Sequence, residues 1–235
     1  MYQMRDRDDL YLEYLRCYNK GKDLRKLRSE SETFQVLSLK QGYPVKYIST
    51  KDVLSLPVDD QLIGADGFYR RHKGFYLIPN EFEGRILSFV IRGLTHDYHD
   101  VPCMSYVRPL FGWYMFEKFK KNDTIIITEG TKDCIILQQY YPYVLALLTA
   151  GITVSNMNIL KSMTNKIILA YDRDSTGLGQ TKKDVELLKS NGIQVQFIKP
   201  KLKDFGKEYK NSTYLKEEIP NVMRKFSRLG AILCQ

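Results

Sequence analysis

The sequence predicts an α/β protein in which a parallel sheet is flanked by helices and preceded by a smaller α+β region. Three observations predict this class. Short apolar strands and helical patterns alternate between residues 122 and 210, a rhythm typical of parallel sheets with right-handed crossovers. A β-hairpin pattern comes before that stretch. A chain of 235 residues with 43% hydrophobic content is also large enough to bury a substantial core.

Changes of pattern divide the chain into four parts. Residues 1–73 combine helical patterns with irregular connections, and residues 74–121 contain the β-hairpin. The alternating strands and helices occupy residues 122–210, and residues 211–235 form a helical tail. Because Pro220 interrupts the helical pattern of that tail, we expect one or two helices there.

The hairpin pattern opens the second part. Residues 75–79 and 85–93 have the composition of paired strands, and residues 80–84 that of the turn between them. Arg85 and Arg92 are seven residues apart, an odd number, so a regular strand places them on opposite faces. At most one of them can then face a site on the same surface. Arg92, which a glycine follows, is our candidate.

The rest of the second part carries no metal-binding pattern. Residues 95–108 are expected to form a polar loop, although they include His96, His99 and Cys103. None of the four cysteines forms a Cys-x-x-Cys pair, so we expect no zinc. Residues 110–121 predict a short helix, whose dense aromatic side chains favour core packing over base stacking.

Charge and hydropathy restrict the class of partner. The formal charge is +9 and the pI about 9.2, a surplus that suits a polyanion such as nucleic acid. The N-terminus is charged and lacks the apolar region of a secretory signal. No window holds the roughly 20 apolar residues that a membrane span needs. We therefore expect a cytoplasmic protein with no membrane partner and with free thiols.

The third part predicts a regular series of elements. Each expected strand is short and apolar, and each expected helix follows a strand. In chain order they are strand 124–128, helix 131–141, strand 143–148, helix 155–163, strand 166–171, helix 176–190 and strand 193–198.

Acidic residues stand where two of these strands end. Glu129 follows the first strand, with Asp133 four residues later, and Asp172 and Asp174 follow the third. Ligands of open α/β sheets gather at the carboxyl ends of the strands, so we expect these carboxylates to converge. Carboxylates this close repel one another unless a divalent cation lies between them. The pattern therefore predicts one or two Mg²⁺ or Mn²⁺ ions and metal-assisted phosphoryl chemistry.

The same residues resemble a known family. The Glu-Gly-x-x-Asp run within 128–133 and the Asp-x-Asp-x-x-Gly run of 172–177 resemble the motifs of the Toprim domain. DnaG-type primases, topoisomerases and some nucleases share that domain. The primase branch fits best, because the hairpin and three further segments match it in chain order. These segments are 109–112, 148–153 and 203–209.

The resemblance implies a function and a set of site residues. It implies a Toprim parallel sheet and a primase-like nucleotidyltransferase, which makes short RNA primers on single-stranded DNA from ribonucleoside triphosphates. The acids that would hold the metal ions are Glu129, Asp172, Asp174 and Asp204, of which the first three would be catalytic. The residues that would bind nucleotide or nucleic acid are Arg92, Lys132, Asp133 and Arg173. A replicative helicase or another replisome protein is the expected partner, in a bacterial cell or a phage-infected host.

Two departures from the family pattern leave alternatives open. Residues 101–105 stand where bacterial primases carry a Lys-Tyr-x-Asn-Ser element, and Gly206 stands where a second acid often follows the one at Asp204. One alternative is a Toprim metal-dependent nuclease that uses the same acids. The other is a catalytically weak nucleic-acid-binding subunit of a replication or transcription complex. The missing lysine and asparagine favour the binding subunit, whereas the hairpin match argues against the nuclease.

Overall fold

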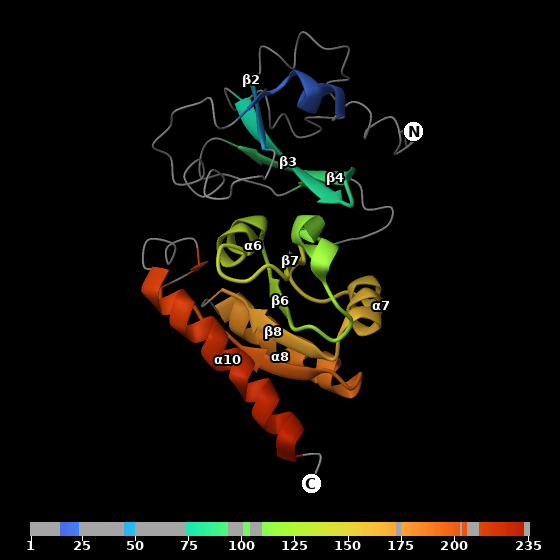
Figure 1. Cartoon of the computed structure of the whole chain (residues 1–235). Helices are drawn as coiled ribbons and strands as arrows, with labels where there is room; N and C mark the ends of the chain where they lie inside the picture. Colours follow the sequence, from blue (N-terminus) through green and yellow to red (C-terminus); the bar gives the residue numbers. More distant parts are fainter. Residues whose placement is uncertain are drawn as a thin grey trace. The chain divides into compact units, whose positions relative to one another are not determined.

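The chain forms two compact units, Met1–Val107 and Arg108–Gln235, each built on a sheet of its own (Figure 1). The first sheet is antiparallel and the second is parallel, which confirms the predicted α/β class. This computed structural model describes residues 15–23, 45–49, 74–93, 101–103, 110–172, 175–202, 204–205 and 212–232.

The first unit contains a five-stranded antiparallel sheet in which neighbours in sequence are neighbours in space, in the order β1-β2-β3-β4-β5. Residues 15–20 are helical. The strands are β1 (Lys22–Asp23), β2 (Lys46–Ser49), β3 (Gly74–Phe82), β4 (Arg85–Gly93) and β5 (Val101–Cys103).

The turn between β3 and β4 is shorter than the sequence predicted. Only Glu83 and Gly84 separate the strands, and both have positive φ values, 50° and 73°. Two residues with positive φ match the right-handed twist of a hairpin. The prediction of a turn over 80–84 was therefore wrong by three residues. Pro79 lies in β3 beyond Leu77, where the pairing with β2 ends among the described residues, so its missing N–H takes nothing from that ladder.

A bulge in β4 changes the relation between Arg85 and Arg92, which the sequence predicted to face opposite sides of the strand. The pairing between β3 and β4 is regular up to Ser88 and resumes at Ile86, so Leu87 is an extra residue. An inserted residue shifts the alternation of faces by one position. The odd spacing of Arg85 and Arg92 therefore does not place them on opposite faces.

Part of the predicted loop 95–108 is a strand. Residues 101–103 form β5, in which Pro102 lies opposite Val90 of β4. Proline lacks the N–H donor of an interior strand, but β5 is the edge of this sheet, so the donor is not required. His96 and His99 lie outside the described residues.

The second unit contains a four-stranded parallel sheet in the order β7-β6-β8-β9. Its strands lie within two residues of the predicted positions. They are β6 (Ile125–Thr128), β7 (Val144–Ala146), β8 (Lys166–Ala170) and β9 (Gln194–Phe197). The helices are η2 (Trp113–Lys118), α6 (Thr131–Leu137), α7 (Val154–Met163), α8 (Ser175–Ser190) and α10 (Ser212–Ile232).

Burial differs between the central strand β6 and the edge strand β9. Every residue of β6 is buried, as in a parallel strand covered on both faces. By contrast, the residues of β9 are half-buried or exposed, which suits an edge. Helix α6 contacts β6 and β7, and helices α8 and α10 contact β9. The N–H of Ile152, just before α7, binds Asp184 of α8, so α7 and α8 share one face of the sheet.

Residues 110–118 belong to the second unit and continue its sheet at the β7 edge. The N–H of Phe111 donates to the carbonyl of Ala146 at 2.9 Å, and the N–H of Ala146 donates back at 2.8 Å. Gly112 then turns the chain at a φ of 111°, where a Cβ would lie 2.6 Å from the carbonyl oxygen of Val144. The helix that follows is a short 3₁₀ helix, η2, rather than the longer helix predicted.

The aromatic residues of this region pack on one another, as predicted. Trp113 is fully buried, and the rings of Phe116, Phe119 and Tyr143 lie 5.0–5.5 Å apart, centre to centre. The hydroxyl of Tyr141 donates to the carbonyl of Thr124 at 2.6 Å, which places the cluster at the amino end of β6. The carboxyl ends of the strands, where the predicted acids lie, are at the other end of the sheet from this cluster.

Helix α10 is a single helix that continues through Pro220, the long red helix of Figure 1. Leu215, Ile219, Val222 and Phe226 are buried, at the spacing of one helix face. That apolar face keeps the helix continuous although proline removes one backbone hydrogen bond. No helix in the part of the chain that the structure describes is long and apolar enough to cross a membrane.

Candidate active site

The carboxyl ends of the central strands bring two of the predicted acids together. Thr128 and Ala170 are paired at the ends of β6 and β8, so the two strands stop level with each other. Glu129 directly follows β6, and Asp172 comes two residues after β8. Both side chains are half-buried. Glu129 and Asp172 therefore follow adjacent strand ends, whereas convergence of their carboxylates with that of Asp174 stays a prediction.

Glu129 is held from both neighbouring strands. On the β8 side, the N–H of Asp172 donates to Oε1 of Glu129 at 3.4 Å. On the β7 side, the N–H of Leu148 donates to the backbone carbonyl of Glu129 at 3.0 Å. Leu148 makes this bond from a left-handed backbone conformation, with a φ of 58°. The position of Glu129 thus depends on the loops that follow both adjacent strands.

Gly130 and Asp133 form the start of α6, directly after Glu129. Gly130 is the N-cap residue and has an extended backbone, so α6 begins at Thr131. Asp133 lies in the first turn and is only 7% exposed. A carboxylate in the first turn is stabilised by the positive end of the helix dipole. Its burial suits support of the helix start better than contact with nucleic acid.

Lys132 and Asp204, predicted as a phosphate-binding residue and a metal ligand, lie beside each other. The Nζ of Lys132 is 3.8 Å from Oδ1 of Asp204, and their side chains are 18% and 16% exposed. Phe205, the next residue, is fully buried. The contact therefore brings the segment at 204–205 to the first turn of α6.

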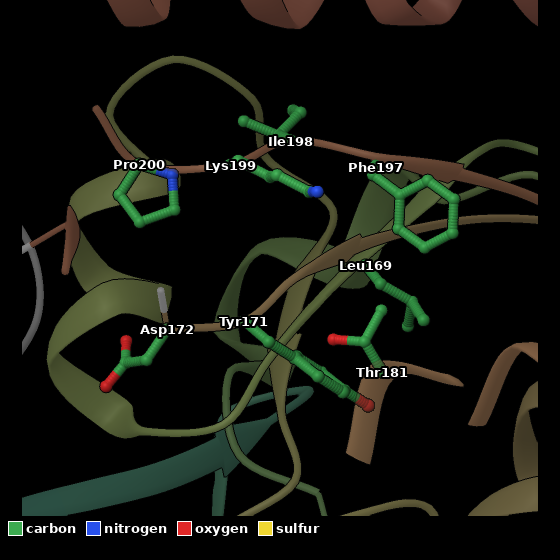
Figure 2. A pocket seen from close by; sticks show the side chains of 8 residues that line it. All are labelled: Leu169, Tyr171, Asp172, Thr181, Phe197, Ile198, Lys199 and Pro200. Atoms are coloured by element: carbon green, nitrogen blue, oxygen red, sulfur yellow. The ribbon is translucent and has the colours of Figure 1, made fainter. Parts of the chain in front are cut away.

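A small cavity lies beside Asp172 (Figure 2). Its volume of about 20 Å³ is room for roughly one water molecule, so the cavity is too small for a nucleotide base. Figure 2 shows the carboxylate of Asp172 pointing away from the ring of Tyr171. The residues that line the cavity are Leu169, Tyr171, Asp172, Thr181, Phe197, Ile198, Lys199 and Pro200.

A buried polar group behind Asp172 was not predicted from the sequence. The hydroxyl of Tyr171 donates to Oδ2 of Asp184 at 2.7 Å, and both residues are almost fully buried. Burial raises the pKa of Tyr171 above its usual value, and the negative charges of Asp184 and Glu129 raise it further. The tyrosine therefore stays protonated and remains a donor. A lone aspartate inside a helical pattern gave no signal of this role.

The remaining predicted residues are not placed. Arg173 and Asp174 lie outside the described residues, and the backbone of Arg92 is in β4 but its side chain is not described. Within the described ranges, no three His, Cys, Asp or Glu side chains gather closely enough to hold a metal ion. The full acidic set therefore stays a prediction.

The donors that are placed fit a hard divalent cation. Glu129 and Asp172 offer carboxylate oxygens from two adjacent strand ends. Mg²⁺ commonly takes one or two carboxylates and completes its shell with water and substrate phosphates. Neither sulfur nor imidazole is needed for such a site.

Comparison with known families and proteins agrees with this arrangement. The Toprim-like family matches residues 126–208, a range that contains Glu129, Asp172 and Asp204. A DNA primase of Clostridium acetobutylicum is 36% identical over 139 residues, which cover 56% of this chain and 23% of that protein. Residues 126–208 are thus similar to the Toprim domain, and the chain resembles DnaG-type primases.

Further DNA primases are similar to this chain in sequence or fold. A DNA primase of Aquifex aeolicus is 28% identical over 184 residues, which cover 69% of the chain and 35% of that primase. This chain thus spans well under half the length of these two relatives.

Two solved structures share the fold. One is the Aquifex aeolicus primase with its zinc-binding and RNA polymerase domains, with a TM-score of 0.67 at 22% identity. The match covers 95% of this chain and 62% of that structure. The other is a DnaG primase catalytic domain bound to single-stranded DNA, with a TM-score of 0.68 at 19% identity. It covers 93% of this chain and 79% of that structure.

Proposed function

We propose that this protein is a primase-like nucleotidyltransferase that makes short RNA primers on single-stranded DNA. The observation that carries the proposal is the contact between Asp172 and Glu129 at the carboxyl ends of adjacent parallel strands. That pair lies within the range that matches the Toprim-like family. The relatives with the matching stretch are DNA primases, which favours priming over other Toprim chemistry.

The acids at the carboxyl ends of the parallel strands would hold Mg²⁺ or Mn²⁺. Glu129 and Asp172 supply oxygen ligands from β6 and β8, and we assign Asp174 and Asp204 to the same set from the resemblance. When bound, a divalent cation would neutralise the charge that develops on the attacked phosphate and on the leaving pyrophosphate oxygen, and would make the attacking hydroxyl more acidic. Two ions fit the proposal as well as one.

The residues of the chain have separate roles in the proposed reaction. The 3′-hydroxyl of the primer attacks the α-phosphate of a ribonucleoside triphosphate, a new P–O bond forms, and pyrophosphate leaves. Glu129 is assigned either to accept the proton of that hydroxyl or to hold a metal ion. Lys132, Arg92 and Arg173 are assigned to the phosphate charges of the nucleotide or template.

A replicative helicase or another replisome protein is the proposed partner of this enzyme. That proposal follows from the resemblance to primases, which act beside helicases in replication. It is separate from the proposed chemistry, because the assay below needs only the chain, template and nucleotides.

A primer-synthesis assay tests the reaction. The protein is incubated with single-stranded DNA, labelled ribonucleotides and Mg²⁺ or Mn²⁺, and the products are separated by length. Asp172→Asn should lower primer yield by on the order of 100-fold, because it removes a carboxylate that would hold the divalent cation at the reacting phosphate. Glu186→Gln, the same chemical change at an exposed position of α8, is the matched control and should leave the yield unchanged.

The other outcomes distinguish the alternatives. Shortened DNA without labelled RNA would replace the proposal with a metal-dependent nuclease. Neither product, with salt-sensitive binding of the DNA intact, would indicate a binding subunit. Primer yield that is the same in Asp172→Asn and the wild type would remove this aspartate from the mechanism.

A further inference from the structure

Asp184 lies near the middle of α8, outside every motif of the proposed site. Its side chain is 2% exposed and accepts hydrogen bonds from three donors. Oδ2 accepts from the hydroxyl of Tyr171 at 2.7 Å, and Oδ1 accepts from Nε2 of Gln180 at 2.8 Å. The backbone N–H of Ile152 lies 3.3 Å from both oxygens. A buried carboxylate satisfied in this way is held in a fixed orientation.

Two of these donors come from the loops on either side of Glu129. Ile152 belongs to the loop after β7, and Tyr171 directly follows β8. Because β7 and β8 are the two neighbours of β6, one carboxylate connects the segments that flank the end of that strand. The loop after β7 also supplies the N–H that binds the backbone carbonyl of Glu129.

Tyr171 connects Asp184 to Asp172, because its hydroxyl binds Asp184 and its backbone is bonded to Asp172. Figure 2 shows the tyrosine ring extending from the end of β8 toward Thr181 of α8, while the carboxylate of Asp172 points the other way. The hydroxyl at the far end of that ring is the group that Asp184 binds. Fixing the ring therefore fixes the peptide between Tyr171 and Asp172, whose N–H contacts Glu129 at 3.4 Å.

We propose that Asp184 is a positioning residue that sets the geometry of the Glu129 and Asp172 carboxylates. It would not touch metal or substrate, but it would align the two strand ends so that both carboxylates meet one divalent cation. This inference rests on the proposed function for its cation. It adds a residue that the motifs of the site do not include.

Metal binding by the full chain is the direct test. Asp184→Asn keeps the size of the side chain but turns one acceptor into a donor, which opposes one of the three incoming N–H or O–H groups. Loss of an outer partner of metal ligands typically weakens metal binding 10- to 100-fold, so we expect about a tenfold loss of Mn²⁺ affinity. Free Mn²⁺ is measured by electron paramagnetic resonance, and Glu186→Gln on the same helix should bind Mn²⁺ as the wild type does.

A double variant separates positioning from a general loss of stability. In Gln180→Glu with Asp184→Asn, the new carboxylate at position 180 accepts from the new amide at position 184, so the polarity of the pair is reversed. The net charge of the wild type is kept. If Asp184 acts by positioning, the double variant should recover most of the Mn²⁺ affinity that the single variant loses.

Tyr171→Phe provides a second route in case Asp184→Asn does not fold. It removes only the hydroxyl and should weaken Mn²⁺ binding in the same direction, by less. Thermal unfolding of each variant shows that it is folded during the measurement. Unchanged Mn²⁺ affinity in folded Asp184→Asn or in folded Tyr171→Phe would overturn the inference, and so would a wild type that binds no Mn²⁺.

The failure of the proposed function would look different. A wild type that binds Mn²⁺ but makes no primers would overturn the priming reaction alone. If Asp184→Asn still weakened Mn²⁺ binding in that case, the positioning role would stand.

Discussion

Glu129 and Asp172 illustrate how one edge of a sheet tolerates two acids. Each carboxylate is half-buried, and one of them accepts the backbone N–H that belongs to the other residue. A hydrogen bond to a charged acceptor favours its ionised form. The bond therefore orients the Glu129 carboxylate, a group that would bind a cation in its ionised form.

Tyr141, at the opposite end of the same sheet, allows a test of pH dependence. Its hydroxyl donates to the carbonyl of Thr124, and burial, followed by the charge of Asp123, raises its pKa above the usual 10.0. The unfolded chain loses this proton near pH 10, whereas the folded chain keeps it. The contribution of Tyr141 to stability is therefore complete below pH 10 and declines as the pH rises beyond it.

Tyr141→Phe should flatten that decline. The variant should lose about 1 kcal/mol at neutral pH, the usual net value of one hydrogen bond, and should fall less steeply than the wild type above pH 10. Urea unfolding between neutral and alkaline pH measures both effects. Tyr140→Phe is the comparison, since burial alone raises the pKa of Tyr140. Equal slopes for Tyr141→Phe and the wild type would contradict the prediction.

At the scale of single residues, the sequence predicted the groups that stand at strand ends. Glu129 and Asp172 follow long apolar runs, so their place at the sheet edge could be inferred from the pattern of the strands. Asp184 and Tyr171 could not be found in this way. Their contact joins a helix interior to a strand end, and one aspartate among other polar helix residues has no distinctive spacing.

At the scale of elements, two glycines with positive φ allow the cost of backbone conformation to be separated from the cost of crowding by neighbouring atoms. Gly112 and Gly192 have φ values of 111° and 77°. A Cβ at Gly112 would lie 2.6 Å from the carbonyl oxygen of Val144, whereas a Cβ at Gly192 meets nothing within 4 Å. Both positions therefore carry a backbone cost, and they differ in crowding.

Alanine at each position should separate the two costs. Gly192→Ala should destabilise the protein by about 1–2 kcal/mol, the usual cost of a left-handed conformation with a side chain. Gly112→Ala should cost about 1–3 kcal/mol more, because the β7 edge must move to admit a methyl group. Chemical denaturation of both variants measures the difference. Equal losses of unfolding free energy in the two variants would show that the backbone around Phe111 and Ala146 can move apart at no cost.

The elements that were predicted with the wrong limits have identifiable causes. The turn at Glu83 and Gly84 is shorter than predicted, because the residues at 80–82, although partly polar, still belong to β3 and pair with β4. Strand β5 was missed because Pro102 suggests a loop, and proline is acceptable only at an edge that the sequence cannot identify. Helix α10 continues through Pro220 because its buried face, seen only after folding, outweighs the lost hydrogen bond.

At the scale of the whole molecule, the net charge of +9 predicts how template binding responds to salt. Each phosphate contact on a single strand lowers the slope of log K against log salt concentration by about 0.7. With roughly three such contacts, affinity for single-stranded DNA should fall about tenfold or somewhat more between about 50 and about 200 mM NaCl. Fluorescence anisotropy measures this fall, and Asp172→Asn should keep the same slope. A flat salt response would exclude a phosphate-based interface.

The order of elements was the most predictable feature at this scale. The alternation of apolar strands and helices from residue 122 onward determined a parallel sheet, and the positions of β6 to β9 were inferred within two residues. Contacts assign residues 110–118 to the second unit, whereas the sequence prediction grouped them with the hairpin. The reason is the pairing of Phe111 with Ala146, a long-range contact that local patterns do not encode.

Leu148 has a bearing on how this protein would evolve under selection. Its left-handed backbone costs about 1–2 kcal/mol that glycine or asparagine would largely avoid. A library selected for heat resistance alone should therefore be drawn to substitutions at this position. The N–H of Leu148 also binds the backbone carbonyl of Glu129. A substitution at Leu148 that raises thermal stability could therefore change the position of Glu129, so selection for stability and selection for primer synthesis could favour different residues here.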